Sequence, residues 1–307
     1  MAKPPSLHQV IQGNTHTNAY KTPREKHIQR CKRSLTVRKI SNRMEYLGYA
    51  LSVLIGVALG LIGGGGSILT VPVLVYVMGV SPVLSTSYSL FVVGLTALIG
   101  SVDYARKGLL DYRTALIFGI PSILAVYSTR KFLVPLIPDP VLHLGSFVLN
   151  KNLFIMVLFA VLMVAASVSM IRNRKKLESH GLYEKWYNLP LIFAEGLVVG
   201  TLTGLVGAGG GFLIIPALVL LAGLPMKKAV GTSLLIIGVK SLIGFMGDVG
   251  HQPIDWKFLL QFSTFAIVGI FVGAQLSKSI SGEKLKPAFG WFVLVMGIYI
   301  LFREMLF

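Results

Sequence analysis

The sequence predicts an all-α polytopic membrane protein, built from two homologous helical repeats with glycine-broken helices. Three observations support this fold class: an apolar composition, apolar runs of nearly membrane-spanning length, and a glycine-rich segment that occurs twice. Of the 307 residues, 54% are hydrophobic and only 13% are charged, whereas charged residues make up about 25% of an average soluble domain. The mean hydropathy is +0.73.

Apolar runs recur along the whole chain. A helix needs roughly 20 apolar residues to cross about 30 Å of hydrocarbon, and several runs approach that length. They cover residues 83–102, 112–126, 152–171, 230–248, 258–276 and 287–306. Together with the glycine-rich segments, these runs predict eight to ten membrane helical elements.

The glycine-rich segment 60–72 returns at 204–216, an offset of 144 residues. The match continues without a gap until Asp111-Tyr112 meets Asp255-Trp256, and 17 of the 53 aligned positions are identical. Doubled apolar halves with glycine-interrupted helices are typical of transporters whose substrate binds between the repeats.

The chain divides into a tail (1–44), a first repeat (45–171), a linker (172–188) and a second repeat (189–307). Residues 1–43 carry ten Lys or Arg against the single acid Glu25, which predicts a disordered cytoplasmic tail beside anionic lipid. The linker is also basic, so we expect it in the cytoplasm as well. We therefore expect an integral protein of the cell (plasma or inner) membrane, with its N-terminus cytoplasmic.

The tail gives no indication of nucleic-acid binding, because no interleaved aromatics or folded scaffold accompany its charge. The only cysteine is Cys31. No intrachain disulfide and no cysteine-based metal or redox site can therefore form in the membrane part.

The number of spans per half stays open. Residues 46–79 form either one long broken span or two short helices in a hairpin, and residues 189–221 raise the same choice. A single broken span places tail and linker on one side, as the basic residues favour. A hairpin is compatible with inverted repeats, which are common among transporters.

The glycine tracts are the first candidate binding site. Glycine adopts positive φ at little cost, and unwound backbone survives in a membrane only where protein buries it or water lines it. A helix restarting at Ser67 or Phe212 would present free amides to an anion. Alternatively, the glycines only permit close helix packing. The predicted backbone set is Gly63, Gly64, Gly65, Gly66, Ser67, Gly207, Gly209, Gly210 and Gly211.

Polar side chains inside apolar runs complete the candidate set. Ser89 and Ser233 are a matched pair, with Ser87 and Thr232 adjacent, and their hydroxyls would donate to an anion or bond their own helix. Lys240 lies near the middle of its run, where a charge costs about 2.5–3.5 kcal/mol. It would attract an anion, or pair with Glu195 or Asp248. Glu195 is the acid we expect to act if transport is proton-coupled.

Other polar residues have structural interpretations. Asp111 and Asp255 precede apolar helices and are predicted N-caps, and Asp103 and Asp248 are expected to be similar residues at span ends. Single histidines and the absence of a catalytic arrangement predict no metal, no cofactor and no enzymatic activity.

These motifs together resemble the sulfite exporter TauE/SafE family over residues 46–306. The resemblance rests on the two glycine-rich segments ending in Pro72 and Pro216, on residues 230–234 (VGTSL), and on Ile254-Asp255-Trp256. It implies a secondary transporter of a small sulfur-containing anion. Thiosulfate-importing relatives use cysteines along the path. This membrane part has none, which favours sulfite or a small organosulfonate.

The two halves differ where Ser87-Tyr88-Ser89 faces Gly231-Thr232-Ser233 in the alignment, so Tyr88 is a candidate gate on one side. The alternatives are a passive anion channel and a membrane-embedded interaction or assembly protein. The sequence sets neither the direction of transport, nor the coupling ion, nor the oligomeric state.

Overall fold

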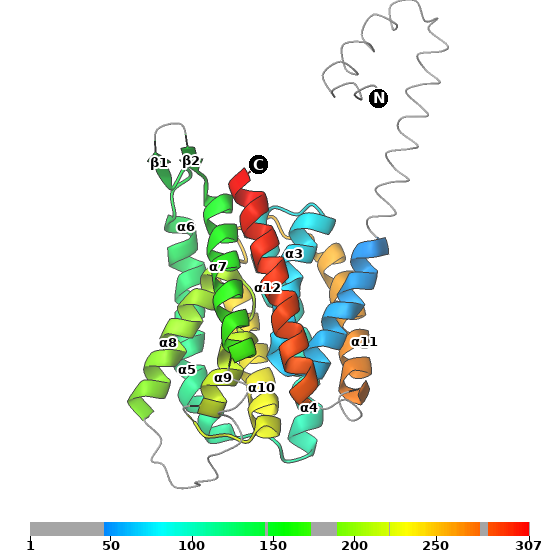
Figure 1. Ribbon diagram of the computed structural model, residues 1–307. Helices are drawn as coiled ribbons and strands as arrows, with labels where there is room; N and C mark the ends of the chain where they lie inside the picture. Colours follow the sequence, from blue (N-terminus) through cyan, green and yellow to red (C-terminus); the bar gives the residue numbers. More distant parts are fainter. Residues whose placement is uncertain (1–45, 145–146, 173–188, 221, 277–281, 307) are drawn as a thin grey trace, which may run out of the picture. The chain divides into compact units, whose positions relative to one another are not determined.

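The computed structural model describes residues 46–144, 147–172, 189–220, 222–276 and 282–306. The predicted tail and all but the first residue of the predicted linker lie outside these ranges. The described residues are almost entirely helical (Figure 1). The bounds are Tyr46–Ile62 for the first helix, then η1 Gly63–Leu69, α3 Thr70–Pro72, η2 Val73–Val77, α4 Pro82–Arg106, α5 Tyr112–Ser128, η3 Thr129–Leu133, α6 Val134–Leu136, β1 Leu142–Leu144, β2 Phe147–Leu149, α7 Lys151–Arg172, α8 Leu189–Val206, α9 Gly211–Leu220, α10 Met226–Met246, α11 Trp256–Leu276 and α12 Gly282–Leu306.

Five helical stretches are long and apolar enough to cross a membrane, and three shorter apolar helices accompany them. The five are α4, the continuous stretch from α5 through α6, the first 18 residues of α7, α10 and α11. The shorter ones are Tyr46–Ile62, Gly66–Val77 and Pro190–Val206. With α9 and α12, this confirms the predicted all-α polytopic fold and its eight to ten elements.

Residues 46–77 form a hairpin rather than one broken span. A Cβ added to Gly48 would lie 1.9 Å from the Met78 sulfur, and one added to Gly66 would lie 2.4 Å from the Leu59 nitrogen. The returning arm therefore lies against the outgoing helix, with the glycine tract at the tip. The α8–α9 segment folds back in the same way (Figure 1): a Cβ on Gly210 would lie 2.1 Å from Thr203 Cγ2.

Helices that match in sequence run in opposite directions. The offset of 144 carries Pro82, the start of α4, onto Met226, the start of α10. Yet the start of α4 lies beside the end of α10, where Ser87 donates to Asp248. Further along, Gly94 contacts Leu242 and Gly238 contacts Leu98. α4 and α10 are therefore antiparallel, which is the relation that inverted repeats would give to matched helices.

Glycines bring each hairpin helix onto a long helix of the other half. A Cβ on Gly56 or Gly60 would lie 1.9 or 2.6 Å from backbone oxygens of α11. At the same offset, Gly200 approaches Ser122 O of α5 at 2.6 Å, and Gly204 approaches Thr129 Cβ at 2.8 Å. Small residues allow such close backbone packing in membrane bundles.

The long helices α5 and α11 begin at the predicted caps. A side-chain oxygen of Asp111 accepts from Thr114 N at 3.0 Å, and one of Asp255 accepts from Phe258 N at 3.1 Å. The N-cap predictions for both aspartates are confirmed.

Gly48 and Arg172 lie at opposite ends of the helix bundle. Gly48 lies beside Met78, four residues before α4 begins. The start of α7 also lies there, because Asn152 Oδ1 accepts from Val83 N at 3.4 Å, so Arg172 ends α7 at the other end. The prediction that the tail and the linker are cytoplasmic stays a prediction.

Candidate functional site

The tips of the two glycine hairpins meet inside the bundle. A Cβ on Gly64 would lie 2.3 Å from Gly211 Cα, and one on Gly211 would lie 2.1 Å from Gly64 Cα. Side chains larger than hydrogen are therefore excluded where the two tracts cross. The structure brings together the two segments that the sequence matched, at the boundary of the two halves.

The tracts begin alike and then differ. Gly63 and Gly207, a matched pair, have φ values of +72° and +73°. Beyond this point Gly63–Leu69 winds into a 3₁₀ helix, which pairs amides with carbonyls three residues earlier. The expectation of an unwound first tract is therefore wrong beyond Gly63. The second tract is unwound, with Gly209 and Gly210 also at positive φ, and helix α9 restarts at Gly211 rather than Phe212.

The predicted hydroxyls have different surroundings. Ser67 donates to Gly64 O at 2.7 Å, and Ser233 donates to Val230 O at 2.8 Å, so both bond their own helical turn. Ser89 is fully buried, and its hydroxyl has no hydrogen-bond partner among the described residues. Of these three serines, only Ser89 has a free buried hydroxyl.

Tyr88 and Thr232, which match in the alignment, make matching contacts. The Tyr88 hydroxyl accepts from Asp255 N at 2.7 Å, and Thr232 Oγ1 accepts from Asp111 N at 2.9 Å. Each hydroxyl therefore holds the capping residue of a long helix in the other half. Their predicted parts in gating and substrate binding stay predictions.

We expect Tyr88→Phe and Thr232→Val each to lower the free energy of unfolding by about 1 kcal/mol, the usual net value of one hydrogen bond. Thermal unfolding of the purified variants measures the loss. If both residues act only through these contacts, the affinity for the transported solute stays within twofold of that of the unchanged protein. A tenfold loss with Thr232→Val alone would instead show direct contact with the solute.

Lys240 is a buried cation beside the second tract. Its side chain is fully buried, and Nζ donates to Thr203 Oγ1 at 3.1 Å. A Cβ on Gly210 would lie 3.0 Å from the same Nζ. Neither Glu195 nor Asp248 lies within ion-pair distance, and across the described ranges no carboxylate does. Glu195 keeps one buried carboxylate oxygen, Oε2, that has no partner in the described part of the chain.

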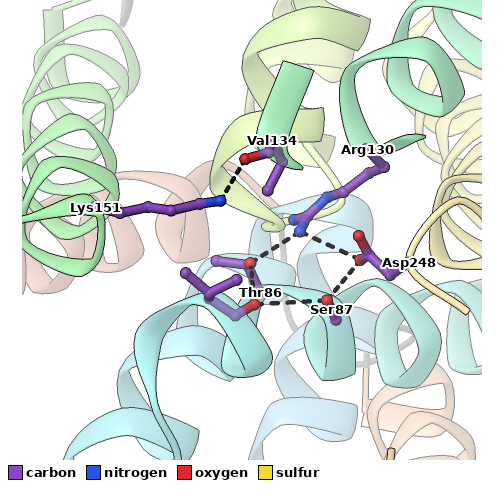
Figure 2. A network of polar contacts seen from close by, with 7 residues as sticks. Thr86, Ser87, Arg130, Val134, Lys151 and Asp248 are labelled. Atoms are coloured by element: carbon purple, nitrogen blue, oxygen red, sulfur yellow. Dashed lines mark hydrogen bonds and ion pairs between the residues drawn. The ribbon is translucent and has the colours of Figure 1, made fainter. Parts of the chain in front are cut away.

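Arg130 and Asp248 form a buried ion pair (Figure 2). Arg130 Nη1 lies 3.3 Å from Asp248 Oδ2 and donates to Thr86 Oγ1 at 3.0 Å. Ser87 donates to Asp248 Oδ2 at 2.5 Å. Thr86 in turn packs on the second tract, since a Cβ on Gly207 would lie 2.4 Å from Thr86 Cβ. We call Thr86, Ser87, Arg130 and Asp248 the Arg130 cluster.

The Arg130 cluster belongs to one side of the molecule only. The offset of 144 places Val230, Gly231, Ala274 and Tyr104 at the positions that correspond to Thr86, Ser87, Arg130 and Asp248. Val230 packs on Gly63 as Thr86 packs on Gly207, and Gly231 packs on Tyr104 where Ser87 bonds Asp248. The second copy thus keeps the packing and replaces the charges with apolar, aromatic or small residues.

This cluster was not predicted from the sequence. Asp248 does lie at a span end, two residues after α10, as predicted, but its side chain is buried against Arg130, a contact that the sequence pattern did not indicate. Asp103 does lie at an exposed span end, paired with Lys107. Arg130 falls four residues after the apolar run that ends at 126, outside the predicted span. The hydroxyl-rich run Ser85–Ser89 was the available indication.

The geometry defines a class of protein: a polytopic helical membrane protein in which the tips of two glycine-rich hairpins meet beside buried ionisable side chains, as in transporters with broken helices. The comparisons with known proteins give the family. Residues 49–300 match the family described as "Sulfite exporter TauE/SafE", which is most of the chain. The chain belongs to this family, and it is a membrane transporter.

Curated relatives agree. A "Probable membrane transporter protein" of Xylella fastidiosa (strain 9a5c) is 32% identical over 255 residues, covering 82% of this chain and 92% of the relative. The "Probable membrane transporter protein YunE" of Bacillus subtilis (strain 168) is 26% identical over 279 residues, covering 84% and 98%. No solved structure gives a significant match.

Proposed function

We propose that the chain is a secondary transporter of a small sulfur-containing anion, with sulfite or a small organosulfonate as substrate. The observation that carries the proposal is Lys240, a buried basic side chain beside the second hairpin tip with no carboxylate within ion-pair distance in the described ranges. The ionisable side chains that are buried in the described ranges are Arg130, Lys240 and Asp248. Their sum is positive, and a buried cation without a carboxylate favours an anionic ligand.

The proposed site is the unwound second tract together with Lys240. Amides around Gly207, Gly209, Gly210 and Gly211 and the ammonium of Lys240 would hold the anion, with the free hydroxyl of Ser89 as a further donor. The first tract, Gly63–Ser67, would close the site from the other half. Thr232 and Ser233 would need to exchange their present partners to reach the substrate.

Transport would proceed by rocking of the inverted halves around this site. The support is the crossing of the tips at Gly64 and Gly211, which lets each half expose the same site to its own side. Energy would come from a gradient, since the sequence has no nucleotide-binding loop. For a proton gradient, Glu195 is the proposed carrier, on the ground of its buried, unpartnered Oε2.

We propose that the N-terminal tail faces the cytoplasm of the cell, on the ground of its positive charge. Cys31, the only cysteine, gives a test without mutation. A membrane-impermeant maleimide should label it only after cells are permeabilised. Labelling in intact cells would refute this orientation and place the tail outside the cytoplasm.

Transport itself is tested with purified protein in proteoliposomes. We expect saturable uptake of sulfite, sulfoacetate or methanesulfonate driven by a substrate or proton gradient, and no uptake in empty vesicles. Flux that grows linearly with the gradient would favour an anion channel. No flux and no binding of any of these anions, or of thiosulfate, sulfate and taurine, would refute the substrate class.

A further inference from the structure

One edge of the Arg130 guanidinium makes no hydrogen bond to the described residues. Arg130 is 1% exposed, and Nη1 makes both of its polar contacts, with Asp248 and Thr86. Nε and Nη2 are buried, and neither has a hydrogen-bond partner among the described residues. These two nitrogens carry the parallel N–H groups that bind two oxygens of one carboxylate, phosphate or similar oxyanion.

Leaving two guanidinium donors buried without partners is costly. An unsatisfied buried donor destabilises the folded protein, and more so when the group is charged. Packing alone does not require an arginine at this position, because Ala274 occupies the corresponding position in the second half. The donors are therefore better explained by a ligand than by packing.

The neighbours of Arg130 fix the direction of that edge. Thr86, held by its own bond to Val83 O at 2.7 Å, and Asp248, held by Ser87, fasten Nη1 from one side. The Arg130 backbone is fixed as well, because a Cβ on Gly247 would lie 3.0 Å from Arg130 Cβ. Side-chain entropy is thus already lost before a ligand arrives.

We infer that the Nε–Nη2 edge of Arg130 is a second oxyanion-binding site, separate from the glycine tract and Lys240. Lys240 lies in α10, and Asp248 follows it by eight residues, just after the end of that helix. At 1.5 Å per residue, the two residues are roughly 12 Å apart along the helix axis. The site would take a group with two oxygens on one atom, such as a sulfonate or sulfite. This inference rests on the proposed anion transport. It adds a second anion-binding step at the end of the bundle where Gly48 lies.

Asp248 has a defined effect in this arrangement. Its carboxylate balances Arg130 when no anion is bound, and it also repels an anion approaching the free edge. Removing its charge should therefore tighten anion binding, whereas a purely structural ion pair predicts a loss of stability alone. This difference in sign makes the inference testable without removing Arg130.

The experiment is a calorimetric titration of the full-length purified protein with methanesulfonate and with sulfite. We expect Arg130→Lys, which keeps the charge but not the parallel donors, to raise Kd at least tenfold, and Asp248→Asn to lower Kd severalfold. Lys131→Gln, an exposed charge change one residue away, should leave Kd within twofold. If Arg130→Lys does not fold, the neutral pair Arg130→Met with Asp248→Asn replaces it.

The outcomes separate the two proposals. If the unchanged protein binds the anions and Arg130→Lys or the neutral pair binds them equally well, the Arg130 site is refuted and the proposed function stands. An unchanged Kd in Asp248→Asn also refutes it. If the unchanged protein binds none of the anions, the proposed function itself fails.

Discussion

Lys240→Met is expected to raise the stability of the protein and to abolish most of its transport. The Lys240 ammonium is fully buried, and within the part of the chain that the structure describes its one hydrogen-bond partner is the Thr203 hydroxyl. Burying a charge without a counter-charge opposes folding, and a lysine at the centre of a membrane helix costs about 2.5–3.5 kcal/mol on insertion scales. Methionine has a similar length and no charge, so the variant should unfold at higher temperature.

The same substitution should weaken anion binding. A hydrogen bond to a charged group contributes about 1.5–3 kcal/mol, which is roughly 10- to 150-fold in affinity. Flux in proteoliposomes and the Kd for sulfite measure the loss, and Lys131→Gln serves as the control for altered charge at an exposed position. Full flux together with raised stability would show that Lys240 is not part of the binding site.

Several features of the fold follow from the sequence on physical grounds. The apolar runs located α4, α5, α7, α10, α11 and α12, because a membrane-spanning helix requires a continuous stretch of such residues. Asp111 and Asp255 located the starts of α5 and α11, because a short acid before an apolar run is a strong N-cap. The matched glycines located both hairpin tips, since only glycine accepts the left-handed φ of Gly63 and Gly207.

The direction of the glycine-rich segments and the pairing of residues far apart in the chain could not be predicted from the sequence. The charge pattern favoured a single broken span, but hairpins form because each tip is buried against the other half, a tertiary contact that no local pattern encodes. Arg130 and Asp248 are 118 residues apart in the chain, and each lies at the edge of an apolar run. Pairing them required knowing that α4 and α10 are antiparallel and that α5 lies alongside α10.

Gly207→Ala is expected to be among the most destabilising single changes outside the charged site. Gly207 has φ +73°, and its Cβ would lie 2.4 Å from Thr86 Cβ and from the Thr86 carbonyl oxygen. The left-handed conformation costs a non-glycine residue about 1–2 kcal/mol, and overpacking adds about 1–3 kcal/mol. We expect a total loss of roughly 2–5 kcal/mol of unfolding free energy.

Gly79→Ala is the matched control for that loss. Gly79 has φ +69°, but a Cβ there would meet no atom within 4 Å. It therefore carries only the conformational cost, about 1–2 kcal/mol, and the difference between the two variants isolates the contact with Thr86. Thermal unfolding of both variants in the same detergent measures the two losses of stability. Equal losses would mean that the hairpin tip moves away from Thr86 without an energetic penalty.

The two glycine variants should also differ in anion binding. Thr86 accepts a hydrogen bond from Arg130 Nη1 at 3.0 Å, so displacing Thr86 by the new methyl group shifts the guanidinium and its free edge. Any Gly207→Ala protein that folds should therefore bind methanesulfonate more weakly, through the shifted guanidinium and through the displaced Gly207 amide of the proposed tract site, whereas Gly79→Ala should bind it as the unchanged protein does. If both variants bind methanesulfonate more weakly, the loss of affinity does not come from Arg130. It would then be explained by reduced stability of the hairpins.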